Sequence, residues 1–415
     1  MGRSRKYDLV IMGATGFTGR LTAEYLAVNY GVKNDQFTWA IAGRNKSRLL
    51  KLKGHLVRFD PDAGSLPILI AESSDRESLD AMTSQTKVVI TTVGPYLKYG
   101  ADLVVSCAEN GTNYCDITGE VLFIRNSIDR NFKTARQNLC RIVHCCGFDS
   151  VPSDLGVLFL QDNSQKIYGM PCDHVTLYVR STKGGLSGGT IDSMLNTRDQ
   201  LRMDLKLRGL LGNPYALNPK EYPSGPDESD LRSVEWDHRM KCWTGPFVMA
   251  GINTRVVRRT NALLNNRYGA DFRYSEVLSF PNGAVGWMRA NLLLLGMGCF
   301  IGAIKFSPSR WLLQNIFLPK PGQGPSRKKR DNGHFHMMIE GTTKNNNNAI
   351  RVSVKGDRDP GYAGTAQMLT ESALCMIMNK DELPDRYGVL TPAVAFGDTP
   401  IRRLAGKGIE FKHHE

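Results

Sequence analysis

The sequence predicts an α/β protein with an N-terminal Rossmann domain, which is a doubly wound parallel sheet, followed by a second, mixed α+β domain. Short apolar strands alternate with helical patterns up to about residue 150, and the pattern changes after that point. Regular alternation of strands and helices is typical of a parallel sheet with helices on both faces. A chain of 415 residues is also too long for one ordinary core, so we expect two domains.

The first domain is expected over residues 1–150. Its strands are expected at residues 6–12, 37–42, 66–71, 87–93, 113–117 and 141–146. Helical patterns follow the first four of these strands, at residues 18–30, 45–54, 74–82 and 101–110. Ligands of such open sheets bind outside the carboxyl ends of the strands, so the turns that follow the strands are the places to search for a site.

The second domain is expected over residues 151–360, as a domain for the substrate or for oligomerisation. Its elements are expected as a strand at 174–181, a helix at 190–208, a long excursion at 212–245 and a hairpin formed by 334–342 and 349–356 around an Asn-rich turn at 345–348. A helix is expected at 361–379. One alternative is that the C-terminal segment, about residues 361–415, packs back on the first domain.

A glycine loop joins the first strand to the first helix, with the sequence Gly13-Ala14-Thr15-Gly16-Phe17-Thr18-Gly19. The first glycine permits the tight turn, the second lets the backbone approach a pyrophosphate, and the third lets helix and strand pack closely. Backbone N–H groups at the helix N-terminus then face the phosphates. The loop and its place between strand and helix predict a dinucleotide site; a plain tight turn is the alternative.

The end of the second strand indicates which dinucleotide is bound. NAD enzymes usually place Asp or Glu there, to bond the ribose 2′-hydroxyl. This strand ends in Arg44-Asn45-Lys46 after a glycine, without an acid. The guanidinium of Arg44 suits a 2′-phosphate and Lys46 adds a positive charge, so we expect NADP(H). The alternative is that both are solvated turn residues.

The turn Val93-Gly94-Pro95-Tyr96 ends the fourth strand. Its place at the carboxyl edge of the sheet predicts that it lies near the ribose and nicotinamide of the cofactor.

Several segments carry a resemblance to a known family. The segments TTVGPYLKYG (91–100), YCDITGE (114–120) and GFDSVPSDLG (147–156) resemble the saccharopine dehydrogenase-like oxidoreductases. Later segments resemble, more specifically, the trans-acting enoyl reductases of bacterial polyketide-lipid assembly: NTRVVRRTNALL (253–264), DFRYSE (271–276), PKPGQGPSRK (319–328) and GVLTPAVAFGD (388–398). The resemblance implies an NADPH-linked reductase of an α,β-unsaturated acyl thioester held on a synthase carrier domain. A related reductase of another carbonyl or imine, and a non-catalytic NADP-binding protein at a lipid surface, remain alternatives.

Candidates for the proton donor follow strand ends. Tyr96 carries a hydroxyl after the fourth strand, Asp116 lies at the end of the fifth, and Asp149 follows the sixth. The alternatives are a packed aromatic ring for Tyr96 and capping roles for the carboxylates. His144 lies in an apolar strand, which favours a core histidine. No cysteine or histidine spacing typical of a metal site is present, so no metal is expected.

Residues 292–304 form an apolar run of 13 residues, LLLLGMGCFIGAI. A spanning helix needs about 20 apolar residues, so we expect the run to be too short to cross a membrane. A buried helix, a contact within a homo-oligomer and an interfacial element remain open. Trp287 and Trp311 flank the run, and basic residues follow it, which suits an anionic membrane surface.

The net charge of +13 suits anionic partners such as a phosphorylated cofactor, an acidic carrier protein or an anionic membrane. The positive charge is spread along the chain and no nucleic-acid-binding module is recognisable, so nucleic acid is not an expected partner. The N-terminus has no apolar stretch of the signal-peptide kind, which predicts a cytoplasmic protein, with peripheral attachment to a membrane as the alternative.

Overall fold

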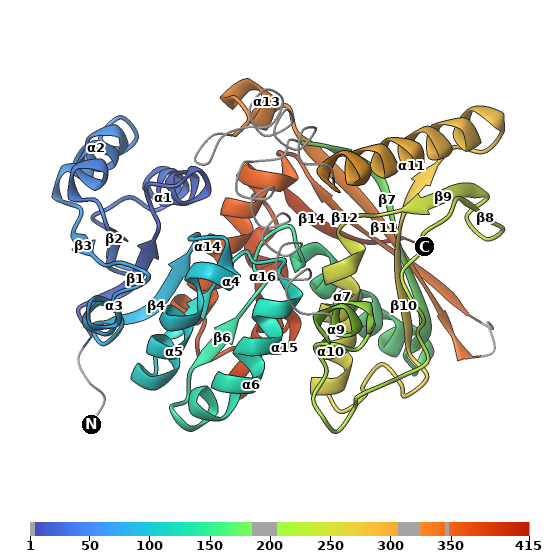
Figure 1. Cartoon of the computed structure of the whole chain (residues 1–415), viewed down its shortest axis with the longest axis horizontal. Coiled ribbons are helices and arrows are strands. Elements are labelled where there is room, and N and C mark those ends of the chain that lie inside the picture. The colour runs from blue at the N-terminus through green and yellow to red at the C-terminus, as the bar shows by residue number, and fades with distance from the viewer. Residues whose placement is uncertain (1–4, 185–205, 306–323, 345–347, 415) are drawn as a thin grey trace.

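Two seven-stranded sheets organise the chain and lie side by side in Figure 1. The computed structural model describes residues 5–184, 206–305, 324–344 and 348–414. The first sheet occupies the left half of the view, and the second sheet, with long twisted strands, occupies the right half.

The first sheet is parallel throughout, in the order β3-β2-β1-β4-β5-β6-β13. Its strands are β1 (Tyr7–Met12), β2 (Trp39–Gly43), β3 (Ile68–Ile70), β4 (Thr86–Thr91), β5 (Asn113–Cys115), β6 (Arg141–Val143) and β13 (Gly388–Leu390). The strand order reverses between β1 and β4, as in a doubly wound sheet. The predicted Rossmann fold is confirmed.

Helices cover both faces of this sheet because its strands are apolar on both sides. Leu9 and Ile11 of β1 pack with α1 (Phe17–Asn29), α2 (Lys46–Leu56) and α14 (Thr365–Met378). Val10 and Met12 face the opposite side. That side carries α3 (Arg76–Thr83), α5 (Ala101–Asn110) and α6 (Val121–Gln137).

The second sheet is mixed, in the order β14-β12-β11-β7-β10-β9-β8, and only β10 and β7 pair in parallel. Its strands are β7 (Cys172–Lys183), β8 (Glu235–Asp237), β9 (Cys242–Pro246), β10 (Arg273–Phe280), β11 (His334–Thr343), β12 (Ala349–Gly356) and β14 (Ile409–His414). Helix α7 (Val151–Tyr168) packs on one face of it, and α10 (Ala250–Leu263) packs against α7 and β10.

The hairpin of β11 and β12 confirms the prediction, although residues 345–347 of its turn lie outside the described residues. The expected helix at 190–208 lies mostly outside them too, and its end coincides with α9 (Lys206–Gly212). The expected excursion at 212–245 needs correction, because it contains β8 and the start of β9, which pair at the sheet edge.

The apolar run belongs to a longer helix than expected. Helix α11 extends over Ala284–Lys305 and includes the polar residues Arg289 and Asn291 before the run. By length and composition alone, its stretch Ala284–Ala303 is sufficient to cross a membrane. The expectation considered residues 292–304 alone, and the helix that contains them is longer because a helix tolerates a few polar residues within an apolar stretch.

The C-terminal segment contributes to both sheets. Strand β13 extends the first sheet beside β6, and α14 packs on α1 and β4, whereas β14 pairs with β12 in the second sheet. A buried ionic cluster holds α14 in place: Glu371 accepts hydrogen bonds from Tyr25, Tyr30, Arg403 and Lys407. Because Tyr25 belongs to α1, this cluster also fixes the helix that follows the glycine loop.

Candidate active site

The glycine loop has the geometry of a phosphate-binding turn. Gly13 has a φ of +82°, a region that favours glycine, and a Cβ there would lie 2.6 Å from Cγ2 of Val93. A Cβ on Gly19 would lie 2.3 Å from the Gly13 carbonyl oxygen. Helix α1 starts at Phe17 after Gly16, without a side-chain cap. The turn therefore leaves the helix N-terminus open to an anion, as a dinucleotide pyrophosphate requires.

Phe17 is held by residues distant in sequence. Its ring meets the ring of Tyr362 edge-on, with centroids 5.1 Å apart, and the guanidinium of Arg330 lies 5.5 Å from its centroid. Phe17 thus joins the start of α1 to the segment before α14 and to α13 (Arg327–Asp331). Thr15 is exposed at the tip of the loop, and the Thr18 carbonyl accepts a hydrogen bond from the Thr22 hydroxyl.

The three residues after β2 have two different roles: two lie at a position for the cofactor, and one caps a helix. Arg44 and Lys46 are exposed at the carboxyl end of the strand, where an adenosine 2′-phosphate would be met. Arg44 lies 3.7 Å from the carboxylate of Glu72, which follows β3. Asn45 instead accepts a hydrogen bond from the Arg48 backbone N–H and caps α2. Its side chain is engaged in the fold.

The turn after β4 lies directly against the glycine loop. Val93 touches the position that a Gly13 side chain would fill, and Gly94 is exposed beside it. Pro95 precedes the short helix α4 (Tyr96–Tyr99). The two turns therefore form one continuous surface at the carboxyl edge of the sheet, where the prediction places the nicotinamide half of the cofactor.

Tyr96 is buried in the core beside this turn. Its hydroxyl donates to the carbonyl oxygen of Thr91, 3.2 Å away, and its ring packs on Phe123. Burial raises its pKa well above the usual value for a tyrosine. These contacts favour the alternative of a packed aromatic ring over a proton donor.

Asp116 forms a closed internal network. One carboxylate oxygen lies 2.7 Å from Nδ1 of His144 and accepts from the Tyr114 hydroxyl, and the other accepts the backbone N–H groups of Thr118 and Cys145. The second nitrogen of His144 lies 2.8 Å from the Ser127 hydroxyl. The prediction that His144 is a core histidine is confirmed. Asp116 holds the turns after β5 and β6 together, which favours a structural role.

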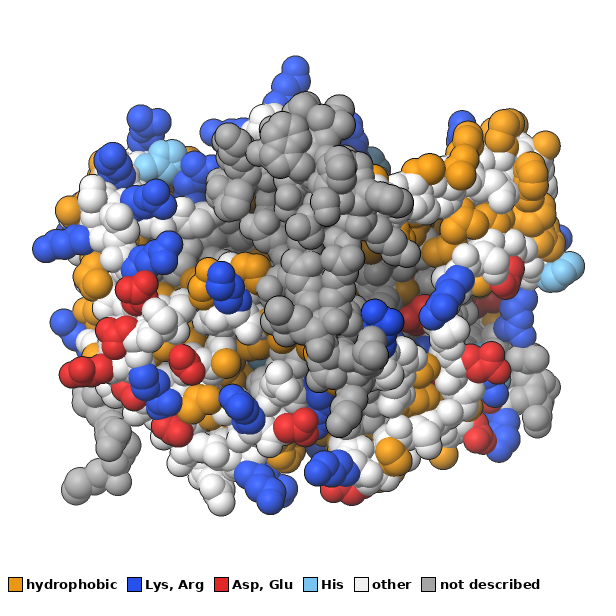
Figure 2. Space-filling view, in the orientation of Figure 1, with side chains coloured by type: hydrophobic (Ala, Val, Ile, Leu, Met, Phe, Trp, Pro, Cys, Tyr) orange, Lys and Arg blue, Asp and Glu red, His pale blue; other side chains and the backbone are white. Residues whose placement is uncertain are grey.

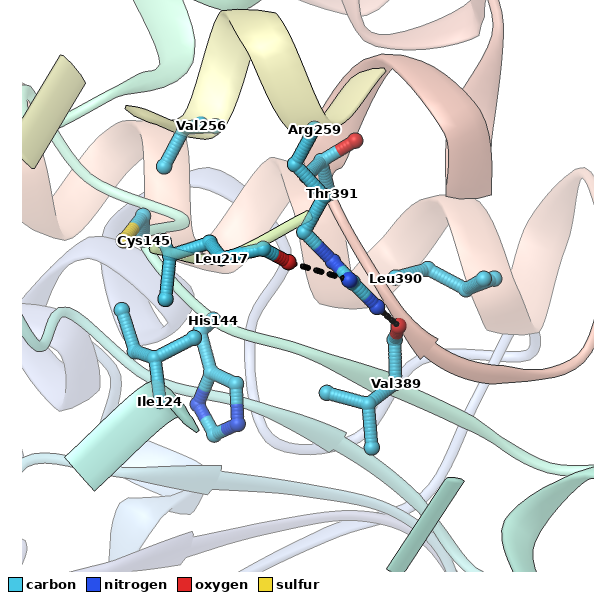
Figure 3. Close-up of a pocket in the computed structure, with 9 residues that line it drawn as sticks. All are labelled: Ile124, His144, Cys145, Leu217, Val256, Arg259, Val389, Leu390 and Thr391. Carbon is cyan, nitrogen blue, oxygen red and sulfur yellow. Dashed lines mark hydrogen bonds between the residues drawn. The ribbon is translucent and has the colours of Figure 1, made fainter. Parts of the chain in front are cut away.

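A small enclosed cavity lies behind this network (Figure 3). The guanidinium of Arg259 points between the carbonyl oxygens of Leu217 and Val389 and donates to both, at 2.5 and 2.7 Å. Burial lowers the pKa of Arg259 to about 9. The cavity measures about 10 Å³, so it has no room for a substrate.

Asp149 differs from the other candidates. It follows β6 at the same carboxyl edge as the glycine loop, and among the described residues its buried Oδ1 has no hydrogen-bond partner. Burial raises its pKa to about 7, and the charge of the nearby Glu276 adds to the increase. A carboxyl group that keeps its proton near neutral pH, with a free oxygen, has the properties of a general acid.

A chain of hydrogen bonds links Ser150, the residue after Asp149, to the second sheet. The hydroxyl of Ser150 donates to Oδ1 of Asn253, at 2.7 Å, and Nδ2 of Asn253 donates to Glu276, at 2.9 Å. Glu276 also accepts from the Tyr274 hydroxyl, at 2.7 Å, and burial raises its pKa. Asn253 lies on α10 and Glu276 on β10, so the two halves of the molecule meet at this carboxyl pair.

Sequence reasoning missed Glu276 and Asn253. One signal was present for Glu276: along β10, it shares a strand face with Tyr274, and an acid on a buried strand face is unusual. Asn253 opens the segment 253–264, which carries the family resemblance, but the sequence alone assigned this residue no role.

These features define an NADP-binding oxidoreductase: a parallel sheet of Rossmann order, an open helix N-terminus behind a glycine loop, and basic residues after β2. The model of the saccharopine dehydrogenase NADP binding domain matches residues 9–140. The chain is 40% identical to the "Putative trans-acting enoyl reductase Rv2449c" of Mycobacterium tuberculosis, over 98% of this chain and 97% of that protein. It is 38% identical to the "Trans-acting enoyl reductase" of Mycobacterium bovis, over 98% and 97%.

The chain belongs to the family of trans-acting enoyl reductases. Among solved structures, apo saccharopine dehydrogenase (L-Glu forming) from Saccharomyces cerevisiae is similar in fold, with a TM-score of 0.52, 12% identity and coverage of 99% of this chain and 100% of that one. The protein is thus an NADPH-dependent reductase with NADP(H) as its cofactor.

Proposed function

We propose that this reductase acts on the α,β double bond of a lipid-like, polyketide acyl thioester. The observation that carries the proposal is Asp149, a proton-holding carboxyl group with a free oxygen at the carboxyl edge of the cofactor sheet. The names of the mycobacterial relatives support the choice of an enoyl substrate.

Reduction of an enoyl thioester adds a hydride at Cβ and a proton at Cα. Bound NADPH supplies the hydride. The Asp149 carboxyl group donates its proton to Cα as the C=C bond is lost, and it is left as a carboxylate that recovers a proton from solvent. Burial beside Glu276 makes the protonated form of Asp149 available near pH 7, which is the range in which a general acid is most effective.

The hydrogen-bond chain positions this acid. Ser150 is the next residue along the chain, and its hydroxyl is fixed by Asn253, which also binds Glu276. The acid and the carboxyl group that raises its pKa are thereby held in one arrangement. We regard Asn253 and Glu276 as positioning residues, because they act on the substrate through Asp149.

The acyl chain is proposed to arrive on the carrier domain of a separate synthase. The net charge of +13 favours approach of an acidic carrier domain. We further propose that the protein works in the cytoplasm, where such a synthase and NADPH are both present, and that it reaches its partner from there.

The test is NADPH oxidation at 340 nm with three substrate classes: an enoyl thioester on an acyl carrier domain, the same enoyl group on coenzyme A, and saturated β-keto or imine substrates. The proposal expects oxidation with the enoyl substrates, faster on the carrier, and a saturated acyl product by mass spectrometry. Oxidation only with the keto or imine substrates would refute it. Tight NADPH binding with no oxidation on any class would support a non-catalytic NADP-binding protein.

A further inference from the structure

Helix α11 presents an apolar face that no described part of the chain covers. Val285, Met288, Leu292 and Leu295 are 56%, 50%, 61% and 64% exposed. They are spaced by three, four and three residues, which places them on one side of the helix, and Cys299 continues the same spacing. Figure 2 shows apolar side chains gathered at the upper right of the molecule, where α11 lies.

The opposite side of α11 is fixed to the second sheet. Ala290 is fully buried and Gly286 is buried beside the strands. The Trp243 indole of β9 donates to the carbonyl oxygen of Gly283, just before the helix, at 3.2 Å. Helix α11 therefore contacts β9 and β10 through its first turns, and no residue of 291–303 is buried. Figure 1 shows the helix at the edge of the second sheet.

Basic residues lie along the same edge of the molecule. Helix α13 contributes the exposed Lys328 and Lys329, and α2 contributes the exposed Arg48 and Lys51. Both helices lie at the upper edge of Figure 1, as does α11, and Figure 2 shows their side chains as blue groups at the top and upper left. An apolar helix face and a row of exposed cations thus point in one direction.

We propose that this edge of the molecule docks on the surface of an anionic phospholipid bilayer, with the outer face of α11 lying in the plane of the interface. Apolar side chains enter the boundary between headgroups and acyl chains, and the cations of α13 and α2 contact lipid phosphates. The contacts of α11 with β9 and β10 favour this in-plane arrangement over a spanning helix. The inference does not depend on the proposed substrate.

The first experiment is flotation of the full chain with vesicles of phosphatidylcholine alone or with 30% phosphatidylglycerol, at 50 and 500 mM NaCl (about 14 and 4 Å Debye lengths). We expect the protein to float with the anionic vesicles at low salt and to do so less at high salt. Failure to float with them at 50 mM NaCl would overturn the proposal.

Two pairs of variants separate the apolar and the electrostatic parts. L292E/L295E is expected to reduce the bound fraction at least tenfold, whereas the matched variant V28E/I167E, on exposed apolar residues of α1 and α7, retains binding. K328E/K329E is expected to weaken binding at low salt, whereas R130E/K133E, on exposed cations of α6, does not. Unchanged NADPH affinity and melting temperature establish that the variants fold. Equal losses in both members of a pair contradict a defined docking face.

A probe on Cys299 tests the depth of the helix. Cys299 is the one exposed residue among the nine cysteines, so a polarity-sensitive thiol label reports on the outer face of α11 without mutation. Anionic vesicles should shift its emission to the blue, and lipids brominated near the headgroup should quench it more than lipids brominated near the bilayer centre. Stronger quenching from the centre would overturn the in-plane arrangement. A shift that follows protein concentration without vesicles, together with a dimer in sedimentation, would assign the face to a second copy of the chain.

Discussion

Asp149 and Glu276 form a carboxyl pair across the junction of the two sheets. Burial is the main cause that raises the pKa of Asp149 to about 7, and the charge of Glu276 adds to it. Asp149 follows a strand of the cofactor sheet, and Glu276 lies on β10 of the second sheet. The acidity of the proposed proton donor therefore depends on how the two halves of the molecule meet.

Replacing Asp149 with asparagine removes the proton while keeping the size of the side chain. Loss of a general acid costs about 10²- to 10⁴-fold in kcat. We expect D149N to lose kcat in this range while the Kd for NADPH, measured by fluorescence titration, stays unchanged. D35N, at an exposed aspartate, serves as the control. A kcat close to that of the wild type would exclude Asp149 as the donor.

The pH profile of kcat reports the same carboxyl group. Because the protonated form acts, activity should be full below the pKa of about 7 and fall as the pH rises through it. E276Q removes the neighbouring negative charge, which lowers the pKa of Asp149, so the alkaline limb should move to lower pH by about half a unit to one unit. The glutamine oxygen can still accept one of the two hydrogen bonds to Glu276. If the alkaline limb of E276Q stays at the wild-type pH, the charge of Glu276 does not act on the acid that controls kcat.

Arg44 is predicted to select NADPH over NADH. Hydrogen bonds to a charged group contribute about 1.5–3 kcal/mol, so R44A should raise the Kd for NADPH roughly 10- to 100-fold. The Kd for NADH, which lacks the 2′-phosphate, should change little. R58A removes an exposed arginine beyond the end of α2 and should alter neither value. Equal weakening of both cofactors in R44A would contradict the assignment.

The buried cluster around Glu371 is predicted to stabilise the cofactor domain. In E371A, Arg403 and Lys407 lose a fully buried carboxylate, and two tyrosine hydroxyls lose their acceptor. Removal of one partner from a buried ion pair costs about 3–5 kcal/mol, so the urea midpoint should fall clearly. E382A, in the exposed pair with Arg402, should leave the midpoint almost unchanged. Equal midpoints for the two variants would show that the cluster adds no net stability.

Local signals predicted the fold and the glycine loop well. The loop could be predicted because a strand, three glycines and a helix lie within one short segment, so the chemistry and the geometry share one stretch of sequence. Asn45 shows the limit of this reasoning. Its position after β2 predicts a cofactor contact, its side chain caps α2, and a cap and a ligand contact look alike in sequence.

The proton donor could not be assigned from the sequence because it depends on contacts between distant segments. Tyr96, Asp116 and Asp149 all follow strands at the carboxyl edge of the first sheet, so their positions in the sequence do not show which of them is the donor. The structure gives Tyr96 and Asp116 internal partners and gives Asp149 a neighbour, Glu276, more than a hundred residues away. The internal partners of Tyr96 and Asp116 and the packing of the second sheet beside Asp149 together distinguish the three.

The position of β13 and β14 has a consequence for biosynthesis. Strand β13 pairs with β6, yet it is separated from it by more than half of the chain, and β14 closes the other sheet within the last residues. The edge of β6 in a nascent chain therefore stays open until residues 388–390 have emerged from the ribosome. Such edges invite pairing with other chains. A chain interrupted before residue 388 would lack one strand of each sheet.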